Sequence, residues 1–194
     1  MSLRHAILGI VSARPMTGYE LIRTFANSVA YTWAAGQAQI YPELHKMEGE
    51  GLLTAQAAAR GAAEKRVYSI TPAGSEELRR WVEAPTRYPA ERDVARLRAT
   101  YLELTPQTSR RFFEDHLAHY TAFLERLQVR ERSVAERSGP LLRARLATRP
   151  AEEHPAIVAF KAHGVVGQIE RAKAEIAWAR AGIELVDRLA AERS

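Results

Sequence analysis

The chain has 194 residues, of which 46% are hydrophobic, and its formal net charge is +5. This length and apolar content are enough to bury a core, which excludes general disorder, and the absence of cysteine excludes disulfides and cysteine-ligated metal sites. No run is long enough to span a bilayer, and the apolar stretch at the amino terminus is too short for a secretory signal, so we expect a cytoplasmic protein. The positive charge is spread over both halves and favours a polyanionic partner only modestly.

The amino-terminal segment predicts two short helices. Residues 2–12 carry Leu3, Ile7 and Leu8 at helical spacing, and Pro15 follows their end. The next signal is the segment Thr17-Gly18-Tyr19-Glu20, which matches a capping box, in which a threonine and a glutamate satisfy each other's backbone amides. It predicts a second helix over residues 18–30.

Residues 36–53 form the stretch around which the chain is organised. Ile40, Leu44 and Met47 recur on one side of a helix, which predicts that this side docks on a core. Gly49 and Gly51 end the helix. The side chains that point away from the apolar side are Gln37, Tyr41, His45 and Lys46. A short helix with such a polar outer face is suited to a DNA groove, but a solvated surface would have the same pattern.

A hairpin and a further helix follow. We expect strands over residues 52–56 and 65–70, and Thr71-Pro72 is a typical start for a helix that reaches about residue 83. Three helices, a two-stranded wing and a helix are the order of a winged helix-turn-helix domain. Residues 85–89 are the expected linker.

The second half of the chain is predicted to be helical. The expected helices cover residues 90–103, a long stretch that starts at Thr105-Pro106 and is broken at residues 138–140, and 156–191. The last of these carries apolar residues in strict four-three alternation, which is typical of helix–helix seams.

We therefore predict a mainly α protein with a small β-hairpin: an amino-terminal winged helix-turn-helix over residues 1–86 and an antiparallel helical dimerisation domain over residues 90–194. The seam would form the dimer, or the long helix would fold back on residues 107–137 of its own chain, and both can hold together. The residues predicted to form the dimer interface are Val158, Val165, Ile169, Ile176, Ile183 and Val186.

Three motifs of the first half resemble a known family. The segment Gln39-Ile40-Tyr41-Pro42, followed by Leu44, Glu48 and Gly51-Leu52-Leu53, is similar to the central signature of the PadR family of transcriptional regulators. Segments 17–21 and 66–71, with Gly74, are similar to it as well. The helical second half resembles in kind the larger subfamily, whose carboxy-terminal domain dimerises. The resemblance implies a homodimer, more often a repressor, on a two-fold DNA operator, and it makes release by a small aromatic effector conceivable.

The start of the third helix departs from the family pattern. Gly36 stands where the family commonly has a small hydroxyl residue, and glycine is a weaker cap than serine. Pro42 also lies inside the second turn if Gly36 is the cap, which removes one helical hydrogen bond. The helix would then begin at Gly36 or nearer Gln39.

The predicted DNA contacts follow from the helix and the wing. Gln37 and Gln39 are candidates for base recognition because a glutamine amide can pair with adenine in two places. Tyr41 and His45 would reach a base or a phosphate, and Lys46 a phosphate. The remaining predicted contacts are Arg60, Lys65 and Arg66 at the wing and Tyr19 in the second helix. Tyr68 is expected in the core under the wing.

Other functions find less support in the sequence. His116 and His119 lie on one helix beside Asp115, but without a further ligand we assign no metal site, and no cofactor is expected. A phosphate loop and a nucleophile motif are absent, so we do not expect an enzyme. The alternative function is a winged-helix module that binds a protein and no DNA. No effector site is assigned to the aromatic residues Trp33, Tyr101, Tyr120, Phe160 and Trp178.

Overall fold

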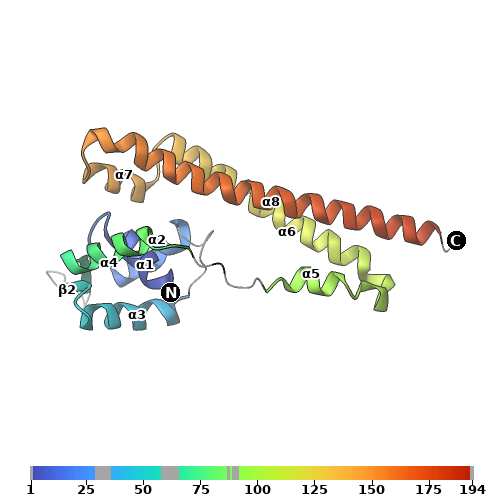
Figure 1. The fold of residues 1–194 in the computed structure, drawn as a ribbon, viewed down its shortest axis with the longest axis horizontal. Helices are drawn as coiled ribbons and strands as arrows, with labels where there is room; N and C mark the ends of the chain where they lie inside the picture. Colours follow the sequence, from blue (N-terminus) through green and yellow to red (C-terminus); the bar gives the residue numbers. More distant parts are fainter. Residues whose placement is uncertain (1, 29–35, 58–65, 87, 89–91, 193–194) are drawn as a thin grey trace. The chain divides into compact units, whose positions relative to one another are not determined.

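The computed structural model describes the chain except for residues 1, 29–35, 58–65, 87, 89–91 and 193–194. The described chain is mainly helical and forms two compact units (Figure 1). The first unit comprises Met1–Thr86 and Val134–Ala159, and the second comprises Arg87–Ser133 and Phe160–Ser194. Residues 134–159, which were predicted to belong to the second domain, are grouped with the first unit in the structure. The roles assigned to the two domains stay predictions.

The first unit contains the predicted order of helices and strands. Its elements are α1 (Ser2–Val11), β1 (Met16–Thr17), α2 (Gly18–Ser28), α3 (Gln37–Gly49), β2 (Leu53–Ala57), β3 (Arg66–Ile70), α4 (Pro72–Glu83), α7 (Pro140–Ala147) and η2 (Ala151–Glu153). The predicted fold class, mainly α with a small β-hairpin, is confirmed. The end of the predicted second helix, at residues 29–30, lies outside the described residues.

One hydrophobic core holds the first three helices and the sheet together. Ile40, Leu44 and Met47 of α3 are fully buried, as their spacing predicts. They meet residues of α1 and α2, including Leu8 and Phe25. The apolar side of α3 is therefore used for docking, which leaves its polar side outside.

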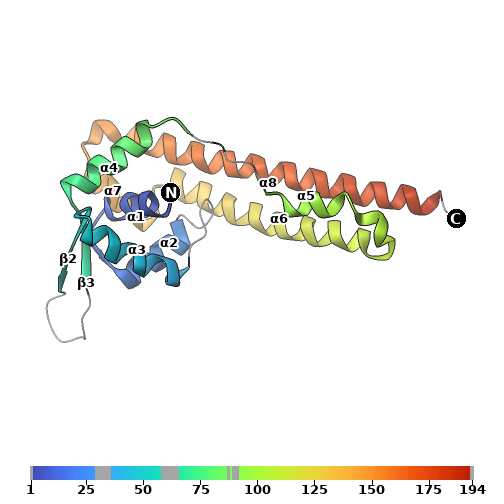
Figure 2. The same cartoon turned by 60° about the horizontal axis from the view of Figure 1, so that its bottom comes forward.

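The sheet has one strand more than the sequence predicted. Its order is β1-β3-β2, and both strand pairs are antiparallel. Figure 2 shows the hairpin of β2 and β3, in which Leu53 lies opposite Ile70. The added strand, β1, has only two residues and places Met16 opposite Tyr68. So short a strand has no periodicity of its own, which is why sequence reasoning saw in these residues only the start of α2.

Backbone geometry at the end of α3 and the start of α4 brings the wing close to both helices. Gly51 has φ of 72° and closes α3, with Leu52 N–H donating to the Met47 carbonyl at 2.9 Å. The Thr71 hydroxyl caps α4 by accepting from Gly74 N–H at 3.0 Å. A Cβ on Gly74 would lie 2.2 Å from the Leu52 carbonyl oxygen, so this contact requires glycine.

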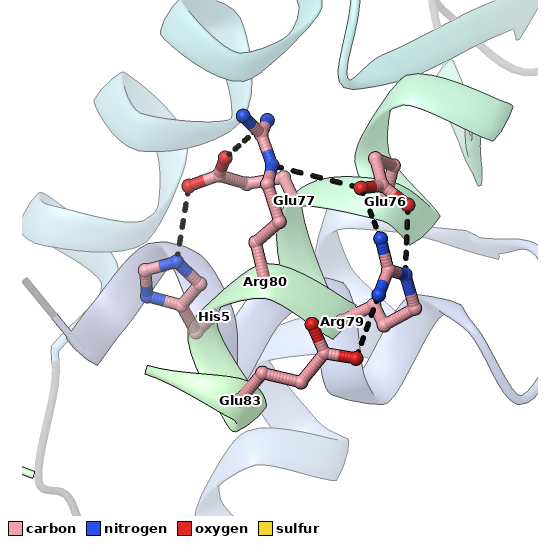
Figure 3. Close-up of polar contacts among 6 residues, drawn as sticks. All are labelled: His5, Glu76, Glu77, Arg79, Arg80 and Glu83. Carbon is pink, nitrogen blue, oxygen red and sulfur yellow. Dashed lines mark hydrogen bonds and ion pairs between the residues drawn. The ribbon is translucent and has the colours of Figure 1, made fainter. Parts of the chain in front are cut away.

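A buried histidine of α1 contacts helix α4, and ion pairs join side chains along α4 itself (Figure 3). The His5 ring stacks on Trp81 with centroids 4.7 Å apart, and its Nε2 lies 3.2 Å from the Glu77 carboxylate. Arg80 pairs with Glu77 at 3.0 Å, and Arg79 lies between two other glutamates of the same helix. These arginines are neutralised locally, so this face is not a basic surface for a polyanion.

Helix α7 is attached to α1 through one arginine. Arg145 donates to the Gly9 carbonyl and, at 3.0 Å, to the Ser12 hydroxyl. Leu141 packs against the core of the first unit, and Leu142 and Leu146 are buried. Burial lowers the pKa of Arg145 below its usual value.

The second unit consists of α5 (Val94–Ala99), η1 (Leu102–Leu104), most of α6 (Pro106–Ala135) and most of α8 (His154–Ala191). The predicted helix over residues 90–103 is wrong in extent. Asp93 caps it by accepting from Arg96 N–H at 2.8 Å, and the Thr100 hydroxyl donates to the Leu97 carbonyl at 2.8 Å. Such local side-chain bonds compete with a continuing helix, and the chain turns into η1 instead.

Helices α6 and α8 run antiparallel within the second unit. The Phe113 ring of α6 packs against Gly182 of α8. A Cβ added to Gly182 would lie 2.3 Å from this ring. One buried carboxylate joins three helices: Glu175 of α8 lies 3.1 Å from the Arg96 guanidinium of α5 and 3.1 Å from His116 Nε2 of α6. The Arg96 guanidinium also lies 4.9 Å from the centre of the Trp178 ring.

Candidate nucleic-acid interface

The start of α2 is fixed by the capping box that the sequence predicts. Thr17 N–H donates to the Glu20 carboxylate at 2.8 Å, and Glu20 N–H donates to the Thr17 hydroxyl at 3.2 Å. The bond from Thr17 N–H, together with the hydroxyl and the nearby Arg14, holds the pKa of Glu20 below its usual value. The turn that carries Tyr19 is therefore rigid, and the Tyr19 side chain is 70% exposed.

Gly18 brings α2 into direct contact with α3. A Cβ at Gly18 would lie 2.6 Å from the ring of Tyr41, so only glycine admits this ring. Tyr41 is half-buried. Two of the three motifs that carry the family resemblance therefore meet in space, and Gly18 sets the position of one of the predicted contact residues.

Helix α3 begins at Gln37 with Gly36 as its cap, which decides between the two starts that the sequence allowed. Gly36 has no side chain to accept a hydrogen bond. The exposed Gln39 compensates in part, because its Oε1 accepts from Gly36 N–H at 3.3 Å. Pro42 lies inside the helix. The Gln39 side chain thus has a role in closing its own helix in addition to the predicted contact with a base.

The outer side of α3 presents two further predicted residues. His45 and Lys46 are exposed, and no ion pair of Lys46 occurs within the described part of the chain. Its ammonium group is therefore available to a phosphate. Arg4 of α1 pairs with Glu43 at 3.2 Å and with Glu50 at 2.7 Å, so these two carboxylates are compensated.

Arg66 of the wing is bound to α3. Its guanidinium donates to Glu48 Oε1 at 2.5 Å and lies 3.4 Å from His45 Nδ1. It also lies 5.9 Å from the centre of the Tyr68 ring. Tyr68 is 1% exposed, which confirms its expected place in the core, and burial raises the pKa of its hydroxyl. Sequence reasoning missed Glu48 as a partner of Arg66, because no spacing in the sequence connects a helix to a strand.

The residues around the base of the wing surround a cavity of about 810 Å³, which we call the wing-base cavity. Its lining residues are Thr17, Gly18, Tyr19, Glu20, Tyr41, His45, Arg66 and Tyr68. Four of the nine predicted DNA contacts, namely Tyr19, Tyr41, His45 and Arg66, therefore lie together. Arg60, Lys65 and the side chain of Gln37 lie outside the described residues.

The predicted dimerisation residues are buried to different extents by the chain itself. Val165, Ile169 and Ile176 are 5–8% exposed, and Val158, Ile183 and Val186 are half-buried. Folding back of the long helix on its own chain, the alternative weighed above, accounts for the first three. The dimer stays a prediction.

The remaining predicted and rejected sites can be placed as well. His116 lies next to Glu175, but no group of three side chains suited to a metal occurs among the described residues. The described helices include none that is long and apolar enough to cross a membrane. Tyr120 and Trp178 both contact the His116 ring, whereas Phe160 is 80% exposed and Trp33 lies outside the described residues. Among the described aromatic residues considered for an effector, Phe160 is therefore apart from the cluster that Tyr120 and Trp178 form around His116.

Comparison with known proteins agrees with the fold and the motifs. Residues 7–80 match the model of the transcriptional regulator PadR-like family. The chain is 33% identical over 129 residues to the negative transcriptional regulator PadR of Bacillus subtilis (strain 168), covering 65% of this chain and 71% of that protein.

Two crystal structures of Bacillus subtilis PadR are similar to the whole chain. The complex with operator DNA matches with a TM-score of 0.70 at 25% identity, covering 96% of this chain and 99% of that one. The complex with p-coumaric acid matches with a TM-score of 0.68 at 24% identity and the same coverage. The protein belongs to the PadR-like family of transcriptional regulators, which are not enzymes.

Proposed function

We propose that the protein is a homodimeric repressor that binds a two-fold DNA operator through α3 and the wing. The observation that carries the proposal is the exposed polar side of α3, whose residues lie beside the wing-base cavity while its apolar side is fully buried. Lys46 is exposed and, among the residues that are described, forms no ion pair with a carboxylate, which suits a phosphate contact. We expect the protein in the cytoplasm, with the DNA.

The residues of this surface would have different roles. Gln37 and Gln39, near the start of α3, are the candidates for base edges, since the amino-terminal part of a recognition helix faces the bases. Tyr19, Tyr41 and His45 surround the wing-base cavity and would contact bases or phosphates at its rim. Arg60 and Lys65 stay predicted phosphate contacts of the wing.

Dimer formation is supported by apolar residues that the chain leaves uncovered in the second unit. Val94, Leu97, Tyr101 and Leu104 of α5 and its continuation are 57–74% exposed, and Leu185 and Leu189 of α8 are 45% exposed. Large exposed apolar patches mark interaction sites. Together with the half-buried Ile183 and Val186 they would form the surface between two copies. Sedimentation velocity at micromolar concentration should give the mass of two chains.

Repression and its release rest on the relatives. The Bacillus subtilis protein is a negative regulator, and one of its structures contains p-coumaric acid. In this chain a cavity of about 690 Å³ between α5 and α6 is lined by Arg98 and Phe112, and the Arg98 guanidinium lies 5.3 Å from the centre of the Phe112 ring. An aromatic acid such as p-coumarate could bind there and release the DNA. Titration of p-coumarate into the protein–DNA complex, with benzyl alcohol as the uncharged control, would test this.

Selection of bound DNA from a random pool at physiological salt tests the proposed function. We expect an inverted repeat whose half-sites are one or two helical turns apart. Changing Gln39 to alanine should relax base preference, whereas Lys46→Ala should weaken all duplexes equally. Arg143→Ala, an exposed arginine of α7, is the matched control and should leave binding unchanged. The proposal would be refuted if no DNA sequence were enriched or if the affinity for DNA did not depend on salt. A stable complex with another protein, without DNA binding, would favour the interaction module.

A further inference from the structure

Arg66 occupies an unusual position for a wing arginine. It is the single basic side chain among the described residues of the wing, and its guanidinium is held by residues of α3. Its two terminal nitrogens have separate partners: one donates to Glu48 at 2.5 Å and the other lies 3.4 Å from His45 Nδ1. The exposed fractions of the Arg66 and Glu48 side chains are 41% and 26%.

The contact between Arg66 and His45 favours one tautomer of the neutral His45 ring. An arginine side chain has only donors, so a hydrogen bond from Arg66 requires an unprotonated Nδ1. The neutral ring then carries its proton on Nε2. Arg66 therefore orients the ring so that its free nitrogen is a donor, which suits a phosphate oxygen or the acceptor edge of guanine.

The pair also fixes two elements against each other. Glu48 lies on α3, Arg66 on β3, and the Tyr68 side chain of β3 is anchored in the core. Since the charges of Glu48 and Arg66 cancel, the pair adds little attraction for a phosphate. Its effect is on geometry, because it ties the strand of the wing to the helix that would enter the groove.

We propose that Arg66 is a positioning residue for operator recognition and makes no phosphate contact. Through Glu48 it fixes the angle between α3 and the wing. Through His45 Nδ1 it determines that the other ring nitrogen, Nε2, is the hydrogen-bond donor. The proposal rests on the proposed function and revises the prediction that Arg66 is itself a DNA contact. A phosphate contact and a positioning role predict opposite results for Glu48, which allows a decisive experiment.

The experiment measures dissociation constants for the selected operator and for a scrambled duplex across a series of salt concentrations. For Arg66→Met and for Glu48→Met we expect the preference for the operator to fall about tenfold, as for one mismatched base pair, while the salt slope stays unchanged. The double variant should be no worse than either single variant, because both remove the same contact. Arg66→Lys, which keeps the charge, should retain part of the preference.

Lys46→Met is the matched control, since Lys46 is an exposed basic residue of the same helix and has no ion pair within the residues that the structure describes. It should weaken both duplexes equally and reduce the salt slope by about one. If Arg66→Met behaves like Lys46→Met, or if Glu48→Met tightens binding by removing a negative charge, the positioning role is overturned.

A second measurement separates this inference from the proposed function. Nitrogen chemical shifts of the His45 ring in the DNA-free protein should show the proton on Nε2, and Arg66→Met should move the ring to a mixture of tautomers. A protein that binds no DNA but shows this change would refute the proposed function alone. If the protein binds its operator, but Arg66→Met changes neither the His45 tautomer nor the operator preference, the positioning role alone would be refuted.

Discussion

The two units of this protein bury their side chains by different means. The first gathers apolar residues from three helices and a sheet into one cluster, closed by glycines and caps at defined places. The second packs one row of α8 against α6 and places a carboxylate, Glu175, at 4% exposure between three helices. The first unit therefore depends on backbone geometry at single positions. The second depends on a periodic seam and one polar cluster, and it leaves apolar residues uncovered.

The largest effect should come from the close approach at Gly74. Gly74→Ala forces a Cβ against the Leu52 carbonyl, and since backbone must move we expect a loss of about 3 kcal/mol in the free energy of unfolding. Gly182→Ala in the second unit meets a ring that can turn, so about 1 kcal/mol is expected there. Thermal denaturation measures both.

Gly164→Ala is the control for both glycine variants. Gly164 lies inside α8 with nothing within 4 Å of an added Cβ, so alanine should stabilise the protein by about 0.5–1 kcal/mol. Equal losses at Gly74 and Gly182 would contradict the contrast between the units.

The polar cluster of the second unit should respond next. Arg96→Met leaves the buried Glu175 with His116 alone, and the lost hydrogen bonds should cost about 2 kcal/mol. Chemical denaturation would measure the loss. Arg110→Met removes the exposed pairs with Glu114 and Asp187 and should cost clearly less, because solvent screens exposed pairs. If the two variants were equally stable, the buried carboxylate would have no special role.

The capping box gives a smaller effect that depends on pH. The pKa of Glu20 is lowered in the folded state, so its ionised form stabilises the fold at pH values above the unfolded pKa, near 4.5. Glu20→Gln should therefore cost about 0.5–1 kcal/mol at pH 7. The difference from the wild type should disappear as the pH falls below 4.5 and through the folded pKa of Glu20. Melting curves at several pH values test this, and a difference that grew in acid would have the wrong sign.

The smallest effect on the subunit should come from the uncovered residues of α5. Leu97 is 60% exposed, so Leu97→Asp should change the free energy of unfolding of the subunit by no more than about 0.5 kcal/mol. Sedimentation should nevertheless show a weakened dimer. Leu127→Asp, at a residue that is fully buried, is the contrasting variant and should unfold the second unit.

The sequence predicted those features of the first unit that depend on residues close together in the chain. The Thr17 and Thr71 caps and the apolar side of α3 all follow from rules that act within a few residues. The two-residue strand β1 and the pair of Arg66 with Glu48 were missed, because each depends on chain segments far apart in sequence.

In the second unit the sequence predicted the apolar row of α8 but not the helix that covers this row. Periodicity reports that Val165, Ile169 and Ile176 are buried without saying against which helix, and the structure covers them with the chain itself. The helix predicted over residues 90–103 was overextended, since the hydrogen bonds that end it come from side chains.

The double role of the Gln39 side chain limits how the operator preference of this regulator can change during evolution. The oxygen that accepts from Gly36 N–H to close the first turn of α3 is the same acceptor that a glutamine would offer to an adenine amino group. A substitution at this position therefore changes base preference and the integrity of the helix start together. A hydroxyl residue at position 36 would separate the two tasks, so we expect relatives that acquire serine there to explore new operators at position 39 more freely than this chain.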